Sequence, residues 1–281
     1  MRKWLTHFKE LYCRFQDDEI QALGAQITYY LILAFFPFLI VLLTVLSYTR
    51  LTTTNILYSL SRILPTDTFE IINEFALHTI SSRSKTLLSF GTIATIWAAT
   101  NGITALIRGI NKAYDEEERR SFLKIQGISI LFMLALILAV LFSLVMLIFG
   151  ELIGRYVFDF FGFSSLFIEF WDKIRFIIPI GLLLIVFAFL YKYAPSIKIP
   201  VKEVWPGALF STAGWLLTSL GFSYYVNNFG NYANTYGSIG GVIVLLVWLY
   251  WSSVIFLVGG ELNATLAFDK QGRKKPRCKH Y

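Results

Sequence analysis

Three polar residues stand beside long apolar segments, where they could form an ion pair or handle a proton or a substrate. Gln26 precedes the first apolar segment, Arg108 directly follows the second, and Glu261 comes just after the apolar core of the last. A charge at the centre of a membrane helix costs ~2.5–3.5 kcal/mol on insertion scales and much less near the interface. We expect Arg108 and Glu261 to pair as a structural lock between two helices. A role in handling a proton or a substrate is the alternative.

Residue patterns typical of enzymes do not occur in this sequence. The three histidines fall in separate polar segments, and there is no HExxH, GxSxG or P-loop pattern. The acidic run from Asp115 to Glu118 precedes two arginines, which is more typical of a solvated loop or helix end than of a metal site. We therefore predict no catalytic residues, no cofactor, no metal ion and no enzymatic activity.

Six segments are apolar for long enough to cross a membrane. Of the 281 residues, 56% are hydrophobic and 15% are charged, whereas a soluble domain has about 25% charged residues. About 20 helical residues cross the ~30 Å hydrocarbon layer. These features exclude a soluble enzyme and a disordered chain. We predict an all-α, polytopic membrane protein with spans at about 27–48, 87–107, 125–149, 174–194, 204–226 and 239–264.

Lysine and arginine are unevenly distributed between the two sides of these spans. If the spans alternate in direction, 18 of the 25 basic residues fall in the two tails and in the loops 108–124 and 192–202. Basic residues accumulate in cytoplasmic loops, so both termini are predicted to be cytoplasmic. The net charge of +7 follows from these loops and does not indicate nucleic acid. Because a reducing cytosol disfavours disulfides, we expect Cys13 and Cys278 to be unpaired.

The polar segments complete the predicted organisation around a membrane domain at 27–267. Residues 1–26 form a cytoplasmic segment whose apolar side chains recur every three or four positions over 3–23. This pattern predicts a helix that lies in the inner membrane interface or packs on loops of the bundle. The external loop 49–86 is expected to hold a short helical hairpin. Residues 268–281 form a basic tail that fits contact with anionic lipid.

Small residues repeat along one face of the fifth apolar segment, with spacings of four and three. A face of this kind lets two helix backbones approach closely, which favours helix packing in lipid. A water-filled path or a lipid cavity beside the same face is the alternative. The residues are Gly207, Ser211, Gly214, Thr218 and Gly221.

Several short motifs occur in a specific order along the chain. They are ALGAQITYY at 22–30 and FPFL at 36–39, IWAA at 96–99 and INKAY at 110–114, and YGS at 236–238, WLY at 248–250 and GGELNA at 259–264. In this combination the chain resembles the YihY/virulence factor BrkB family from about residue 17 to residue 267.

The resemblance implies a six-helix protein of the bacterial plasma (inner) membrane whose biochemical activity is not established. It also implies that an older label of the family, ribonuclease BN, is an error, and the missing nuclease residues agree with this. We expect transport or translocation of a small or lipidic solute. The alternative is a non-transporting envelope protein that binds partner proteins. The expected partner is the lipid bilayer, and we expect neither nucleic-acid binding nor ribonuclease activity.

Overall fold

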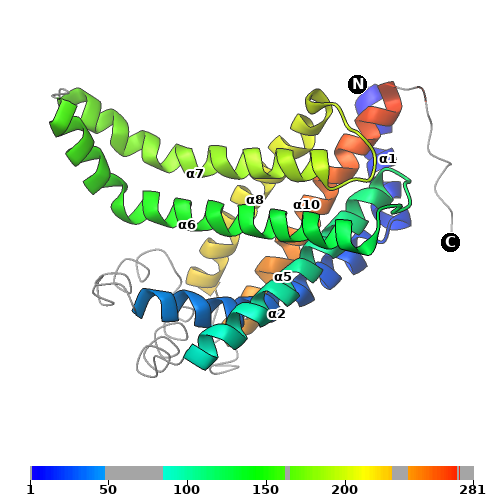
Figure 1. Ribbon diagram of the computed structural model, residues 1–281. Coiled ribbons are helices and arrows are strands. Elements are labelled where there is room, and N and C mark those ends of the chain that lie inside the picture. Colours follow the sequence, from blue (N-terminus) through cyan, green and yellow to red (C-terminus); the bar gives the residue numbers. More distant parts are fainter. Residues whose placement is uncertain (1, 48–84, 162–164, 230–239, 271, 273–281) are drawn as a thin grey trace.

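The computed structural model describes residues 2–47, 85–161, 165–229, 240–270 and 272. All regular structure within these ranges is helical, as the sequence predicts. The described helices are α1 (Arg2–Asp17), α2 (Ile20–Ser47), α5 (Lys85–Ala113), α6 (Phe122–Phe161), α7 (Ser165–Tyr193), α8 (Val201–Phe229) and α10 (Gly240–Lys270) (Figure 1). The predicted external hairpin and most of the basic tail lie outside the described residues.

Each of the six predicted spans overlaps one long helix, although the helix ends differ from the ends of the apolar runs. The helix at the first predicted span, α2, starts at Ile20, and α5 continues to Ala113. With 40 residues, α6 is about 60 Å long, which exceeds the ~30 Å hydrocarbon layer. Hydropathy reports only the part of a helix that suits lipid, so it underestimates helices that continue into the polar interface.

Within the described residues, four helices contain a stretch that is long and apolar enough to cross a membrane. The stretches are Ile20–Leu42, Ser89–Ala113, Phe122–Ser143 and Gly240–Lys270. The apolar part of α7 is shorter, and α8 is not among the four. Small and hydroxyl residues on α8 lower its hydropathy. These helices fit a multi-pass membrane protein, while the six-span topology and the orientation of the termini stay predictions.

The central helix of the bundle is α10, which packs against α1, α2, α5 and α8. Glycines on its neighbours permit this packing. A Cβ atom on Gly24 of α2 would lie 2.8 Å from the Val254 side chain of α10, and one on Gly109 of α5 would lie 2.5 Å from Leu257. Outside this centre, α6 packs on α5 and α7, and α7 packs on α8.

One end of the bundle gathers polar segments that are far apart in the sequence (Figure 1). It contains α1, the α5–α6 connection with the end of α5 (residues 111–121), the α7–α8 connection with the adjoining helix ends (193–203) and the last turns of α10 (261–270). We call it the polar end. Side chains link these segments. For example, Arg120 Nη2 donates to the carbonyl oxygen of Ala194 at 2.6 Å.

The N-terminal segment forms two helices where the apolar periodicity predicts one over residues 3–23. The first helix, α1, ends at Asp17, and α2 starts at Ile20. Between them Glu19 has a φ of 53°, in the left-handed region, and its amide donates to the carbonyl oxygen of Gln16 at 3.1 Å. Such a residue ends a helix and turns the chain. The periodicity does not reveal the break because apolar side chains continue on both sides of it.

The expectation of unpaired cysteines is wrong for Cys13, which is disulfide-bonded; Cys278 lies outside the described residues. The redox state of the cytosol indicates only whether disulfides are favoured there, and it does not depend on how close two cysteines lie in the fold. Because α1 packs against α10, the helix that carries Cys13 lies beside the helix that precedes the C-terminal tail.

The first three residues of the small face of α8 pack against α10. A Cβ atom on Gly207 would overlap the carbonyl oxygen of Gly259, and one on Gly214 would lie 2.9 Å from the Ile255 side chain. Ser211 is fully buried between them. By contrast, Thr218 is only partly buried, and a Cβ atom on Gly221 would meet no atom within 4 Å. Close packing therefore accounts for the first three small residues and not for the whole face.

We predict that Gly207→Ala destabilises the protein by about 1–3 kcal/mol, because an added methyl group must push α8 away from α10. Thermal unfolding of the purified protein in detergent measures the effect. Gly221→Ala is the matched control on the same face. It is expected to be neutral or to stabilise by up to roughly 1 kcal/mol, since alanine has the higher helix propensity. Equal losses in both variants would contradict the packing role of Gly207.

Candidate functional site at the polar end

A buried ion pair joins α1 to α10. Arg14 Nη1 lies 3.4 Å from Glu261 Oε2, and the two side chains are only 5% and 1% exposed. The same nitrogen donates to the carbonyl oxygen of Ala113 at 3.1 Å, and the guanidinium carbon lies 4.8 Å from the centre of the Phe268 ring. A buried charge without a partner is costly. Arg14 and Glu261 therefore hold each other in place, and with them α1 on the bundle.

The structure does not bring the predicted trio of Gln26, Arg108 and Glu261 together. Gln26 and Arg108 are exposed, whereas Glu261 is fully buried. Successive helical residues are turned by ~100°, so Arg108 points away from the face of α5 that buries Ile107 and Ile110. The lock to Glu261 comes instead from Arg14. Sequence spacing gave no signal for it, because the two residues are 247 positions apart.

Hydrogen bonds tie α7, α8 and α10 together next to this ion pair. The Tyr191 hydroxyl donates to the carbonyl oxygen of Phe256 at 2.5 Å and lies 2.6 Å from Ser211 Oγ. Asn263 accepts from the Gly207 amide at 2.7 Å and donates to the carbonyl oxygen of Val204 at 3.2 Å. These side chains are buried and hydrogen-bonded, as buried polar groups require. These hydrogen bonds hold α7, α8 and α10 together.

The last carboxylate of the acidic run forms a clip between the two connections of the polar end. Glu118 accepts two hydrogen bonds from the Arg120 side chain, at 2.7 and 2.6 Å, one from the Arg120 backbone amide at 3.0 Å, and one from Asn111 at 2.8 Å. The other side of the Asn111 amide accepts from the Ser196 backbone amide at 2.7 Å. The hydrogen bonds from Arg120 lower the pKa of Glu118. Glu118 is thus fully engaged in holding loops. Within the described residues, no group of three or more metal-ligating side chains occurs.

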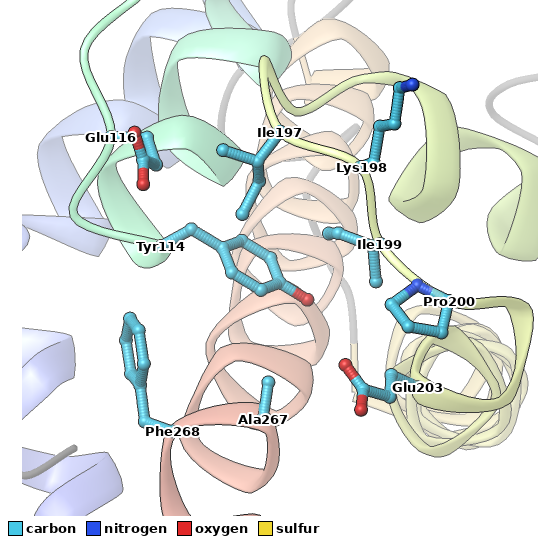
Figure 2. A pocket seen from close by; sticks show the side chains of 9 residues that line it. All are labelled: Tyr114, Glu116, Ile197, Lys198, Ile199, Pro200, Glu203, Ala267 and Phe268. Atoms are coloured by element: carbon cyan, nitrogen blue, oxygen red, sulfur yellow. The ribbon is translucent and has the colours of Figure 1, made fainter. Parts of the chain in front are cut away.

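A small pocket of about 80 Å³ lies between the two connections and the end of α10 (Figure 2). The hydroxyl of Tyr114 points into it, as does the carboxylate of Glu203 (Figure 2). Tyr114 is 3% exposed, and its hydroxyl has no hydrogen-bond partner among the described residues. Its ring meets that of Phe268 edge to face, with 6.4 Å between the centroids. The lining residues are Tyr114, Glu116, Ile197, Lys198, Ile199, Pro200, Glu203, Ala267 and Phe268.

Burial raises the pKa of Tyr114, and the nearby carboxylates of Glu203 and Glu261 raise it further. The phenol is therefore protonated at neutral pH and offers one donor and one acceptor to the pocket. Neither Tyr114 nor Glu203 has a residue type or spacing that predicts a binding site. Tyr114 is the last residue of the INKAY motif, and Glu203 lies in the first turn of α8 outside any motif.

Comparison with known proteins places this arrangement in a family. The profile of the family described as "Virulence factor BrkB" matches residues 11–280. The chain belongs to the virulence factor BrkB family. This confirms the resemblance seen in the sequence. Two of the matching motifs, INKAY and GGELNA, supply Asn111, Tyr114, Glu261 and Asn263 to the polar end of this BrkB-family protein.

Relatives of this BrkB-family protein are bacterial membrane proteins. A UPF0761 membrane protein of Tolumonas auensis is 26% identical over 275 residues, which cover 94% of this chain and 87% of the relative. The "Putative ribonuclease-like protein YfkH" of Bacillus subtilis strain 168 is 42% identical over 262 residues, or 93% of this chain and 95% of the relative. No solved structure matches. The protein is thus a multi-pass bacterial membrane protein, and the matched family description names no enzymatic activity.

For the ion pair, we predict that Arg14→Met destabilises this BrkB-family protein by about 3–5 kcal/mol, because it leaves the Glu261 carboxylate buried without its cation. The double variant Arg14→Met/Glu261→Met is expected to recover most of this loss. Unfolding in detergent measures all three proteins. Arg108→Met, at the exposed position, is the control and is expected to stay within about 0.5 kcal/mol of the wild type. A larger loss from Arg108→Met than from Arg14→Met would contradict the assigned pair.

For the clip, we predict a pH-dependent contribution of Glu118 to stability. Because its pKa is lowered in the folded protein, the contribution is present above the unfolded-state pKa of ~4.3 and is lost as pH falls through the lower folded-state pKa. The difference in Tm between wild type and Glu118→Gln should be constant from neutral pH to about pH 5 and shrink at lower pH. Glu117→Gln, at an exposed neighbouring position, should show no such change. A Glu118 difference that does not vary with pH would refute the clip.

Proposed function

We propose that this BrkB-family protein spans the bacterial inner membrane six times with both termini in the cytoplasm, and that it translocates or presents a small, preferably lipidic, solute at its polar end. The predicted organisation into an amphipathic N-terminal segment, a membrane domain and a basic tail belongs to this proposal. The observation that carries the solute-binding part is the Tyr114 pocket, because it offers a buried hydroxyl and a carboxylate at the predicted cytoplasmic boundary.

The proposed orientation is supported by the basic residues at the polar end. Many of the described lysines and arginines lie on its helix ends and connections, where the positive-inside rule expects the cytoplasmic side. An even number of spans would also leave both termini on that side. The basic residues concerned are Arg14, Lys112, Arg119, Arg120, Lys124, Lys192, Lys198, Lys202 and Lys270.

The preference for a lipidic solute is supported by how α5 and α8 use their polar atoms. The Thr95 hydroxyl bonds to the carbonyl oxygen of Gly91 at 2.7 Å, and the Thr104 hydroxyl bonds to that of Thr100 at 2.9 Å and lies 3.1 Å from Ser129 Oγ. The buried part of the small face on α8 is filled by α10. Thr95 and Thr104 thus bond to the backbone of their own helix, and Thr104 also reaches α6. Because these hydroxyls are satisfied inside the bundle, they favour a solute that moves along the lipid-facing surface over one that needs a water-filled path.

The alternative, a non-transporting envelope protein that binds partner proteins, is favoured by the same satisfied hydroxyls. A sealed bundle needs no path, and its exposed connections could serve as docking sites. The two functions differ in one measurable consequence, which is movement of solute across a bilayer that contains only this protein.

We predict that the purified protein, reconstituted into vesicles, accelerates movement of a fluorescent lipid between the leaflets. The assay is quenching of the outer-leaflet dye by a membrane-impermeant reductant, compared with protein-free vesicles. Arg14→Met/Glu261→Met should slow the movement, because the ion pair holds α1 against the part of α10 that lines the pocket. Gly221→Ala is the matched control and should not slow it. Correctly inserted protein that moves neither lipids nor small soluble dyes would refute translocation and support the partner-binding alternative.

A further inference from the structure

The Tyr114 pocket has acceptors inside and cations outside. Inside it, the Tyr114 oxygen and the Glu203 carboxylate face the same space (Figure 2). Glu203 is 20% exposed and lies 3.7 Å from the ammonium nitrogen of Lys270, whose side chain is 63% exposed. Lys198 is also exposed, and its ammonium group points away from the pocket (Figure 2). Glu203 is thus paired at the pocket rim with a lysine whose side chain is mostly in solvent.

The size and the charges of the pocket limit what it can hold. The pocket volume of about 80 Å³ exceeds the ~10–15 Å³ that a cavity needs to hold one water, so the pocket admits a small polar group. The charged side chains at the pocket are Glu116, Glu203 and Lys198, which line it, and Lys270, which contacts Glu203 from outside. A ligand with a separated cation and anion therefore fits better than a simple ion. The apolar wall of Ile197, Ile199 and Ala267 suits the carbons that join the two charges.

We propose that the pocket binds the primary ammonium of a phosphoethanolamine group, with the phosphate held at the rim by Lys198 and Lys270. The ammonium donates to Glu203 and to the Tyr114 oxygen, which supplies the partner that this buried hydroxyl lacks among the described residues. A quaternary ammonium has no N–H to donate and is larger. This inference rests on the proposed function only in taking a membrane lipid as the source of the group, since soluble phosphoethanolamine carries the same chemistry.

The test measures binding to the full-length protein in detergent by titration calorimetry, with O-phosphoethanolamine and phosphocholine as probes. We expect phosphoethanolamine to bind and phosphocholine to bind at least about tenfold more weakly, which is the scale of one charge-assisted hydrogen bond. Tyr114→Phe and Glu203→Gln should each weaken phosphoethanolamine binding by roughly 10- to 100-fold. The matched controls, Tyr193→Phe and Glu117→Gln, change exposed residues that do not line the pocket and should bind as the wild type does.

Unfolding of each variant without ligand shows whether a loss of binding comes from the missing contact or from misfolding. Tyr114→Phe removes a hydroxyl that bonds to no described residue, so this variant should fold and unfold like the wild type in the absence of ligand. It remains informative even if Glu203→Gln does not fold. Unchanged binding by Tyr114→Phe, equal binding of the two probes, or no binding of phosphoethanolamine in solution or in lipid would overturn the inference.

A second arm identifies the source of the ligand and separates this inference from the proposed function. Native mass spectrometry of protein released from bilayers with equal amounts of phosphatidylethanolamine and phosphatidylcholine should show retention of the first lipid by the wild type and its loss in Tyr114→Phe. Binding of the soluble probe alone would support the site with a soluble source. Binding without lipid movement would refute translocation and leave this site standing, whereas lipid movement without binding would refute this site alone.

Discussion

Helices in lipid gain little from burying apolar side chains against one another, because the lipid tails are equally apolar. The bundle therefore depends on close backbone approach along α10, where neighbouring helices present glycine instead of a larger residue. Gly24 on α2, Gly109 on α5 and Gly207 on α8 each leave room for a part of α10. Once α8 lies this close, Asn263 can reach its backbone, and the Tyr191 hydroxyl can join all three of α7, α8 and α10.

This central packing also determines where charge can be buried. Glu261 follows two glycines on α10 and is fully enclosed, so it requires a cation from a neighbouring element. Arg14 supplies it from α1, and the ring of Phe268 covers the guanidinium. The other face of the polar end is organised differently, since Glu118 and Arg120 pair within one connection and bind the next one. The Tyr114 pocket lies between these two arrangements, and its walls come from both.

The sequence predicted what depends on local composition. Each predicted apolar run overlaps one long helix among the described residues, and the first three small residues of the fifth run lie where α8 packs against α10. The sequence did not predict the contacts between segments that are far apart along the chain. Arg14 resembles any other charge on an amphipathic helix, and Arg108 is closer to an apolar run, so proximity along the chain favoured the wrong arginine. The clip was also hidden, because an acidic run in a loop is usually solvated and only the fold brings Asn111 and Ser196 to Glu118. Tyr114 became a candidate only once its hydroxyl could be seen to face a pocket.

The separation of Arg14 and Glu261 along the chain has a consequence for biosynthesis. The ribosome makes α1 first and α10 last among the described helices. Arg14 on α1 therefore lacks the Glu261 carboxylate while the helices between them are synthesised. Docking of α1 can be completed only after Glu261 has emerged and α10 has entered the bundle. A chain interrupted before residue 261 would therefore leave Arg14 with its bond to Ala113 but without the carboxylate that joins α1 to α10.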